Sequence, residues 1–270
     1  MSAPHGVVSL IGAGHFGAAL VRGFIRAGFG IDSLLISARG RESAALAATY
    51  GLERVADNAA LVRRAKAVVL AVRPSEAAEA VRDLPWRPNQ LLLSVCAGVR
   101  VATLSEATAG RARVVRALPM TSAEFGASPT PLFPDDGEAH ALLAHLGTVV
   151  ALAAEEEMAA ATAAAIAYTF AHDLIARTGA WAADQGLTAK TGRALAAAYV
   201  EAAARAMAAD KATPPDELIA RLATKGGIAE AAYGPLRAAR HGETWRAALD
   251  AALARVRALA GTSSRRTETN

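Results

Sequence analysis

The sequence predicts an α/β domain with a doubly wound parallel sheet, followed by an all-α domain. Two observations support this fold class. In the first half of the 270-residue chain, short apolar runs alternate with helical stretches, which is typical of a parallel sheet with crossover helices. From Glu155 onward the strand signals vanish and long alanine-rich helices follow. We therefore predict one domain over 1–153, a second over 154–262 and a disordered tail over 263–270.

The elements of the first domain follow from its apolar runs and helical stretches. The predicted strands cover 7–11, 33–37, 67–72, 90–95, 113–118 and 148–152. The predicted helices cover 15–27 and 42–50, and one more follows the Pro- and Gly-rich connection 128–137.

Breaks near 186–188, 213–215 and 225–227 divide the second domain into long helices. A stripe suited to helix packing recurs every four residues on the first of them, at Met158, Thr162, Ile166, Phe170 and Leu174. The small-residue faces of this helix exceed what one small domain would bury. We therefore expect a homodimer, or a higher homo-oligomer, built on this region.

Composition excludes several classes of partner. The net charge of +4 does not indicate nucleic-acid binding, because the basic residues are spread along the chain. One cysteine, Cys96, cannot form an intrachain disulfide, and we expect it to be a small buried residue. No metal is expected, since the histidines lack ligand spacing. His172, Asp173 and Arg177 interrupt the longest apolar stretch and no signal peptide is evident, so we expect no membrane contact and a cytoplasmic location.

The strongest chemical signal is the run Gly12-Ala13-Gly14-His15-Phe16-Gly17, which follows a predicted strand and opens a predicted helix. In a G-x-G-x-x-G turn, the first glycine permits the tight turn and the second lets the backbone approach a pyrophosphate. The third lets helix and strand pack closely. The helix N-terminus adds unpaired N–H groups and a partial positive charge. The motif therefore predicts a dinucleotide cofactor.

The end of the second strand indicates which dinucleotide. An NAD site commonly has Asp or Glu there, to bind the ribose 2′-hydroxyl. This chain reads Ser37-Ala38-Arg39-Gly40-Arg41, without an acid. Arg39 and Arg41 can make charge-assisted hydrogen bonds to a 2′-phosphate. We therefore predict NADPH, with NADH as the alternative.

Several segments, taken in order, resemble the pyrroline-5-carboxylate reductase family along most of the chain. They are IGAGHFGAAL, LAVRP, LLLSVCAGV and VVRALP in the first domain, and GLTAKTGRALA and ATKGGIAEA in the second. The resemblance implies a Rossmann-type domain, a helical dimerisation domain and an NADPH-dependent oxidoreductase acting on a C=N bond. It implies a small cyclic imine carboxylate as substrate, in the first place 1-pyrroline-5-carboxylate reduced to proline in proline biosynthesis.

The resemblance also assigns cofactor roles to matching residues. The run from Gly12 to Gly17 would cradle the pyrophosphate. Contacts to the adenosine ribose would come from Ser37, Arg39 and Asn58, and contacts to the nicotinamide ribose from Ala71, Val72, Arg73 and Pro74. Ala97 and Gly98 would leave space beside the nicotinamide.

The predicted substrate loop is Thr224-Lys225-Gly226-Gly227-Ile228-Ala229, where the family has Ser/Thr-Pro-Gly-Gly-Thr-Thr. Lys225 adds a charge suited to a carboxylate, but both later threonines are lost. Thr121 takes part in a segment that has lost the family's amide side chain, and it is a further predicted substrate contact. Thr224 and Tyr168 are the predicted catalytic residues. The stretch 163–168 replaces the family's Gly-Ser-Gly-Pro-Ala-Tyr and predicts uninterrupted helix.

The predicted mechanism is direct hydride transfer from the nicotinamide C4 to the carbon of the imine, which needs no covalent nucleophile. The protein supplies proximity, orientation and a carboxylate anchor. The departures from the family lie where the substrate would bind, and two alternatives therefore stay open. One is a related reductase acting on another imine or carbonyl in specialised metabolism. The other is a noncatalytic NADP(H)-binding regulator.

Overall fold

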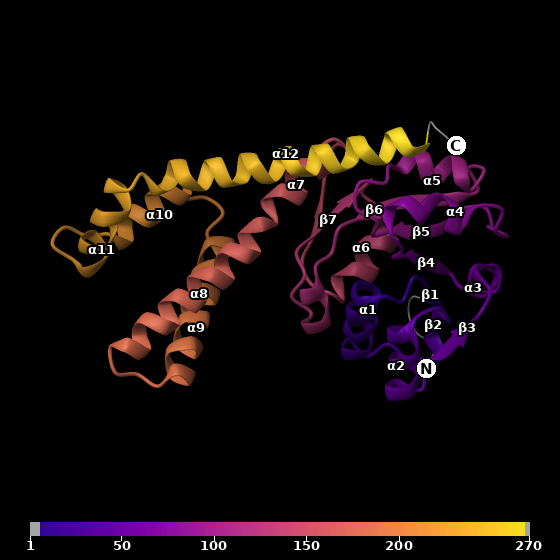
Figure 1. The fold of residues 1–270 in the computed structure, drawn as a ribbon, viewed down its shortest axis with the longest axis horizontal. Coiled ribbons are helices and arrows are strands. Elements are labelled where there is room, and N and C mark those ends of the chain that lie inside the picture. The colour runs from indigo at the N-terminus through magenta and orange to yellow at the C-terminus, as the bar shows by residue number, and fades with distance from the viewer. Residues whose placement is uncertain (1–5, 268–270) are drawn as a thin grey trace. The chain divides into compact units, whose positions relative to one another are not determined.

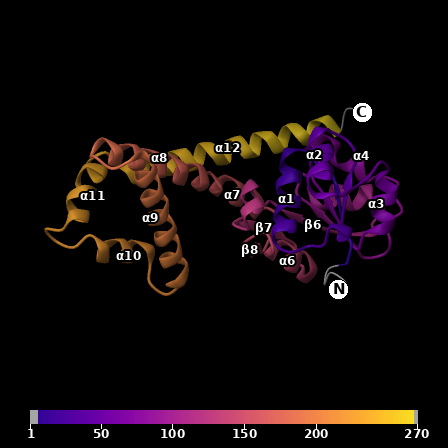
Figure 2. The ribbon, with the colours of Figure 1, turned by 90° about the horizontal axis from the view of Figure 1, so that it is seen from below.

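The computed structural model describes the backbone of residues 6–267 and the side chains of residues 6–258. It divides into two compact units, which are Met1–Ala161 with Val256–Asn270, and Thr162–Arg255. The first unit contains the sheet and the second contains helices only. Figures 1 and 2 label the helices and strands of both units.

One eight-stranded sheet organises the first unit. Its strands are β1 (Val8–Ile11), β2 (Leu34–Ser37), β3 (Glu53–Val55), β4 (Ala67–Leu70), β5 (Gln90–Ser94), β6 (Ala112–Ala117), β7 (Thr130–Phe133) and β8 (Val149–Ala151). Their order is β3-β2-β1-β4-β5-β6-β7-β8, and every neighbouring pair is parallel except β6 with β7. The order reverses between β1 and β4. Open α/β sheets bind ligands at such a switch point, beyond the carboxyl ends of the strands.

Helices cover both faces of this sheet. Residues of α1 (His15–Arg26), α2 (Arg41–Tyr50) and α6 (Gly137–Ala144) contribute to one buried cluster. Residues of α3 (Asn58–Arg64), α4 (Ala77–Val81) and α5 (Val101–Ala107) contribute to the other. Three short 3₁₀ segments also occur, at Ile31–Ser33, Pro74–Glu76 and Thr121–Phe125, and α7 (Glu157–Ala164) follows the last strand.

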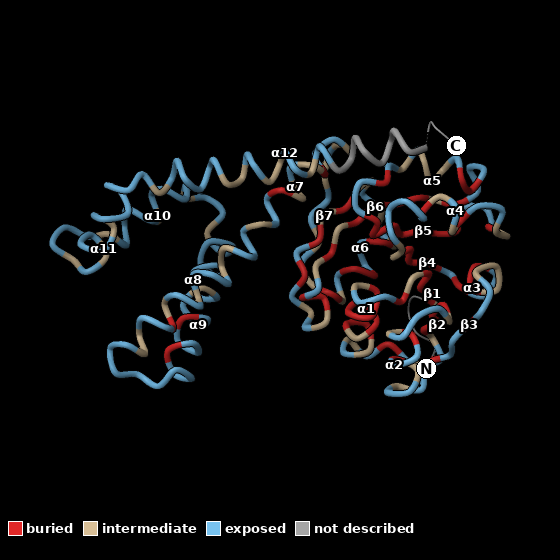
Figure 3. Tube along the Cα trace, viewed as in Figure 1, coloured by how far each residue is buried: buried red, intermediate tan, exposed pale blue. Residues whose placement is uncertain are grey.

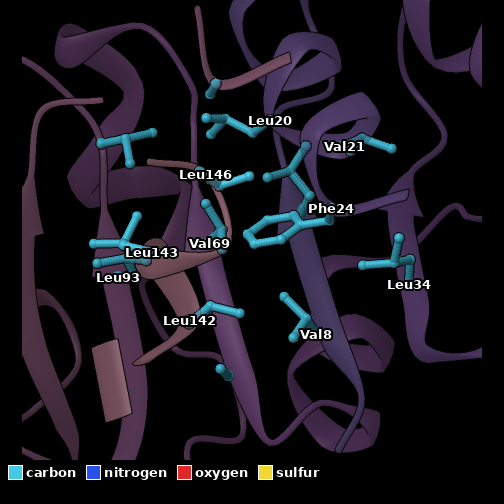
Figure 4. Packing of buried hydrophobic residues seen from close by; sticks show 14 of the residues in the cluster. Val8, Leu20, Val21, Phe24, Leu34, Val69, Leu93, Leu142, Leu143 and Leu146 are labelled. Carbon is cyan, nitrogen blue, oxygen red and sulfur yellow. The ribbon is translucent and has the colours of Figure 1, made fainter. Parts of the chain in front are cut away.

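The strands alternate between these two clusters. Val69 faces the first cluster, whereas its neighbours Val68 and Leu70 face the second. Figure 4 shows the ring of Phe24 on α1 lying among side chains of the first cluster, including Val8 and Val69. Because both faces are buried, each central strand reads as a continuous apolar run rather than an alternating one.

The second unit contains α8 (Ile166–Asp184), α9 (Ala189–Ala209), α10 (Pro215–Leu222), α11 (Ile228–Ala238) and α12 (His241–Thr267), the last of which continues beyond Arg255. The helices α8 and α9 approach closely at two glycines. A β-carbon on Gly192 would lie 2.7 Å from the carbonyl oxygen of Gly179. Most of this unit is exposed (Figure 3), and the buried residues of α8 and α9 are Gly179, Gly192 and Ala196.

The predicted fold class is confirmed, with a mostly parallel sheet first and helices after it. All six predicted strands are present, with ends shifted by one or two residues, and each predicted helix break separates two helices. Two strands are not in the prediction. The strand β3 has only three residues, two of them exposed, and β7 lies in the stretch expected to be a loop. Proline has no N–H to donate to a neighbouring strand. Pro131 fits in β7 because its carbonyl makes the bond instead, accepting the N–H of Leu118.

Two expectations about helices are wrong. The stretch 163–168 is not uninterrupted helix, because α7 ends at Ala164 and α8 begins at Ile166. There the Tyr168 N–H donates to the Ala165 carbonyl, three residues earlier, at 3.0 Å. Such a bond belongs to a 3₁₀ turn, whereas an α-helix bonds residues four apart. The tail predicted from residue 263 is helical to Thr267, since extending a formed helix is cheap. Residues 268–270 lie outside the described residues.

The stretch Glu157–Asp184 is long and apolar enough to span a membrane by length and composition alone. Sequence analysis expects no such stretch, because charged residues interrupt it. Two of these residues pair with each other, with Arg177 Nε 2.7 Å from Asp173 Oδ2. One helix of this kind is weak evidence for a membrane.

Gly23 provides a test of the packing of the first unit. A β-carbon there would collide with the Ala123 carbonyl and lie 2.7 Å from Leu146 Cδ2. We expect Gly23→Ala to lower the free energy of unfolding by about 1–3 kcal/mol, although alanine favours helix. Urea denaturation measures the change. Gly137→Ala is the control, because nothing lies within 4 Å of its β-carbon position. A Gly23 variant as stable as the control would contradict this packing.

Candidate functional site

The turn after β1 is built on two glycines that the fold itself requires. Gly12 has φ +97°, and a β-carbon there would lie 2.5 Å from the Ala71 carbonyl oxygen. A β-carbon on Gly17 would collide with the Gly12 carbonyl and lie 3.0 Å from Leu10 Cδ2. The turn from β1 into α1 is therefore packed against the end of β4 on one side and against α1 on the other. It needs glycine at both positions.

Gly14 differs from its two neighbours. Its φ is −76°, and nothing lies within 4 Å of where a β-carbon would be. No protein contact explains a glycine there. It is the N-cap of α1, which has no side-chain cap and no acidic residue in its first turn. Backbone N–H groups at such a helix end can bind an anion that approaches closely. The residues present therefore fit a dinucleotide pyrophosphate.

The other residues of the turn differ in their exposure. Ala13 is buried, Phe16 is half-buried against the core, and His15 is exposed.

Ser37, at the end of β2, holds the turn in place. Its Oγ accepts the Gly12 N–H at 3.1 Å, and its carbonyl accepts the Ser43 hydroxyl at 2.6 Å. The side chain predicted to contact the ribose thus also links the loop after β2 to the glycine turn. Sequence analysis does not identify this link, because it joins residues 25 apart.

Three arginines lie in or next to the loop between β2 and α2. Arg39 and Arg41 are exposed and flank Gly40, which has φ +92°. Arg54 on β3 donates to the Ala38 carbonyl and, at 3.3 Å, to Ser43 Oγ. Sequence analysis does not identify Arg54, because β3 itself is too short to predict.

The carboxyl ends of β4 and β5 form the next part of the site. The Ala71 N–H donates to the Ile11 carbonyl at 2.8 Å, so the segment 71–74 begins beside the glycine turn. Val72 is half-buried, and Arg73 and Pro74 are exposed. Ala97 and Gly98, which follow β5, are exposed, and Gly98 has φ +79°.

Cys96 supports this part of the site from within. Its Sγ donates to the carbonyls of Leu70 at 3.4 Å and Val72 at 3.3 Å. Burial raises the pKa of the Cys96 thiol to about 11, so it stays protonated at neutral pH. The expectation of a small buried residue is confirmed.

Asn58 and Thr121 follow the carboxyl ends of two different strands, β3 and β6. Asn58 begins α3, and its Nδ2 donates to the Ala80 carbonyl at 3.2 Å. Thr121 is exposed at the start of a 3₁₀ segment. The preceding turn is held by the buried Ser128, whose Oγ accepts the Met120 N–H at 2.8 Å.

The predicted substrate loop lies in the second unit, between α10 and α11. Gly226 has φ +75°, and its N–H donates to Glu230 Oε2 at 2.6 Å. The Gly227 N–H donates to the Thr224 carbonyl at 2.9 Å. The side chains of Thr224, Lys225 and Ile228 are exposed, and Ala229 is half-buried.

Tyr168 lies elsewhere in the second unit. Its ring packs edge-on against His172 with centroids 4.4 Å apart, and its carbonyl lies 2.8 Å from His172 Nδ1. No hydrogen bond joins Tyr168 to Thr224 within the described residues. Their catalytic roles therefore stay predictions.

A buried ion pair lies where β6 meets the segment before α7. Arg116 Nη1 lies 2.5 Å from Glu155 Oε1, and their side chains are 6% and 12% exposed. The same oxygen accepts the Val101 N–H at 2.8 Å. Burial disfavours the charged carboxylate, but the bonds from Val101 and Arg116 outweigh it and hold the pKa of Glu155 below its ordinary value. Within the described part of the chain, no three His, Cys, Asp or Glu side chains form a group that could hold a metal.

Comparisons with known proteins agree with this arrangement. A family model described as NADP oxidoreductase coenzyme F420-dependent matches residues 7–98, and one described as pyrroline-5-carboxylate reductase dimerisation matches 155–259. A pyrroline-5-carboxylate reductase of Pseudomonas aeruginosa is 30% identical over 253 residues, covering 88% of this chain and 90% of the relative. Pyrroline-5-carboxylate reductase 1 of Bacillus spizizenii is 30% identical over 130 residues, covering 46% of this chain and 44% of the relative.

Solved structures share the fold. A pyrroline-5-carboxylate reductase from Coxiella burnetii superposes with a TM-score of 0.79 at 24% identity, covering 94% of this chain and 98% of that one. A Plasmodium falciparum pyrroline carboxylate reductase with NADP bound superposes with a TM-score of 0.77 at 20% identity, with the same coverage of both chains.

Gly14 and Gly12 give opposite expectations. Gly14→Ala meets no protein atom, so we expect unchanged stability. We expect a rise of about tenfold in the Kd for NADPH, because the methyl group would occupy the space predicted for the pyrophosphate. Gly12→Ala should lower stability, because its methyl group meets the Ala71 carbonyl. Calorimetric titration and thermal unfolding measure the two effects. A Gly14 variant that binds NADPH as tightly as the unaltered protein would contradict this account of the turn.

The Glu155 carboxylate gives a pH-dependent expectation. A lowered pKa in the folded state contributes stability above the unfolded-state value of about 4.3, and the contribution is lost as the pH falls through the folded-state value. We expect Glu155→Gln to lose about 2–4 kcal/mol at pH 7, because Arg116 is left buried and unpaired. The difference should narrow towards pH 3 in urea titrations. Glu156→Gln, at an exposed position, is the control. A pH-independent difference would contradict the assignment.

Proposed function

Because the chain belongs to the pyrroline-5-carboxylate reductase family, we propose that it reduces 1-pyrroline-5-carboxylate to proline with NADPH, as an oxidoreductase acting on a C=N bond. Two observations support the proposal. One is the nearly full-length similarity to the pyrroline-5-carboxylate reductase of Pseudomonas aeruginosa, and the other is a glycine turn whose middle glycine serves no packing purpose. The first supports the reaction, and the second supports the nucleotide.

The residues of the first unit would hold the cofactor. The amides at the start of α1 would bind the pyrophosphate, and Arg39 with Arg41 would bind a 2′-phosphate, which favours NADPH over NADH. Ala97 and Gly98 leave the carboxyl end of β5 without a bulky side chain beside the nicotinamide. When bound, the dihydronicotinamide supplies the hydride for the imine carbon, while the nitrogen carries a proton.

The substrate loop would hold the carboxylate of the imine. Lys225 brings an exposed ammonium group, and the amides of Ile228 and Ala229 begin α11 without a side-chain cap. Thr224 is the remaining hydroxyl of the loop and would accept or donate a hydrogen bond at the ring nitrogen, with Tyr168 as a second candidate. Thr121 stays a further predicted substrate contact. Binding and orientation are then the main tasks of the protein, since a protonated imine is already electrophilic.

The second unit would form a homodimer. Large apolar side chains stay exposed on its helices, at Trp181, Tyr199 and Leu222 among others. An exposed apolar surface of this kind marks a protein–protein contact, and the matched dimerisation model covers these positions. We place the protein in the cytoplasm, where its single thiol stays reduced.

The proposed activity is tested by mixing the purified protein with NADPH and 1-pyrroline-5-carboxylate. We expect oxidation of NADPH with stoichiometric formation of proline. Oxidation with other cyclic imines but not with this one would contradict the substrate. Binding of NADPH without turnover on a panel of cyclic imines would contradict the enzyme and favour a regulator.

Lys225 tests the carboxylate anchor. We expect Lys225→Gln to raise the KM for 1-pyrroline-5-carboxylate about tenfold, with kcat changed by less than about threefold, because a uniform binding interaction is lost. Lys211→Gln, at an exposed position between α9 and α10, is the matched control. Steady-state kinetics with saturating NADPH measure both. Equal KM values for the two variants would rule out Lys225 as the anchor.

A further inference from the structure

Arg54 bonds to both ends of the stretch 38–43, which follows the carboxyl end of β2. It stands opposite Ile36 in the parallel pairing of β3 with β2. Its guanidinium reaches the loop that follows β2, where Nη2 donates to the Ala38 carbonyl and Nε donates to Ser43 Oγ at 3.3 Å. One side chain from the edge strand thus holds both ends of the stretch that carries Arg39 and Arg41.

A continuous series of hydrogen bonds runs from Arg54 to the glycine turn. The Ser43 hydroxyl donates to the Ser37 carbonyl at 2.6 Å, and Ser37 Oγ accepts the Gly12 N–H at 3.1 Å. Ser43 is fully buried and Ser37 is 6% exposed, so these bonds have little competition from water. The place of the loop after β2 is therefore set relative to the pyrophosphate turn.

The charges of this region are unbalanced. Arg39, Arg41 and Arg54 are exposed, and none of them forms an ion pair with a carboxylate in the described part of the chain. The two arginines that follow in α3 are different, because Arg63 pairs with Asp57 and Arg64 pairs with Glu53. Glu42 lies in the first turn of α2 but bonds to none of the three. Like-charged guanidinium groups repel one another, and an anion that binds them relieves this repulsion.

We propose that Arg54 determines the preference of this protein for the 2′-phosphate of NADPH. Two of its nitrogens hold the loop that carries Arg39 and Arg41, and Nη1, which makes no hydrogen bond among the described residues, donates to the phosphate. The guanidinium geometry suits this double role, because its donors point in fixed directions. The inference rests on the proposed function, because it concerns the same nucleotide.

The test compares two coenzymes that differ only in the 2′-phosphate. Calorimetric titration gives the Kd of NADPH and of NADH for the unaltered protein and for Arg54→Gln, with no turnover involved. We expect the Kd of NADPH to rise about tenfold in the variant, since a charge-assisted bond is lost, and the Kd of NADH to change by less than about twofold. The remaining affinity for NADPH should also depend less on ionic strength.

Two further variants separate this role from a structural one. Arg64→Gln removes a neighbouring exposed arginine that is already paired with Glu53, and should change neither Kd. Arg54→Lys keeps the charge without the planar fork, and should lie between the unaltered protein and Arg54→Gln for NADPH alone. Thermal unfolding monitors the fold of each variant.

The outcomes are distinct. A parallel rise in the Kd values of NADPH and NADH for Arg54→Gln would show that Arg54 only holds the loop in place. That result would overturn the inference. Unchanged values for both coenzymes would overturn it as well. An unaltered protein that binds neither coenzyme would instead overturn the proposed function on which the inference rests.

Discussion

The structure depends on a steric constraint at Gly12, where the carboxyl ends of β1, β2 and β4 meet. The backbone must turn there at φ +97°, against the Ala71 carbonyl, while its own carbonyl lies against Gly17. Only glycine satisfies this geometry at both positions. The turn aims the uncapped N-terminus of α1 at open space beside Gly14, and Ser37 holds it from β2. The proposed pyrophosphate site is thus a consequence of how one strand leaves the sheet.

The sequence predicts the parts of the fold that leave local signals. Strands buried on both faces appear as apolar runs, and Gly or Pro marks the three breaks from α8 to α11. The break between α11 and α12, at Ala239 and Arg240, has neither residue and is not predicted. Three-residue β3 and proline-containing β7 leave no such signal, because pairing with neighbours far away in sequence stabilises them. The interruption at Ala165 also escapes prediction, since Ala163, Ala164 and Ala165 itself favour helix.

The candidate site likewise has parts that the sequence predicts and parts that it does not. The glycine turn and Arg39 follow from a motif, because a ligand that needs backbone amides and positive charge selects residue types at fixed spacing. The roles of Arg54 and Ser43 come from the pairing of β3 with β2, which no local pattern encodes. The substrate loop keeps its two glycines and gains Lys225, while the exposed apolar side chains of the second unit fit a contact with a second copy. In the proposed reaction the protein mainly binds and orients the substrate, so the chemistry needs few of its groups.

We propose that a nicotinamide dinucleotide binds along the turn after β1 and the loop after β2. Hydrogen–deuterium exchange with and without saturating NADPH tests it directly, segment by segment. We expect NADPH to slow the exchange of the amides in 12–18 and in 37–43, and NADH to slow the first segment more than the second. Unchanged exchange in both segments while NADPH is bound would place the nucleotide elsewhere and contradict the account.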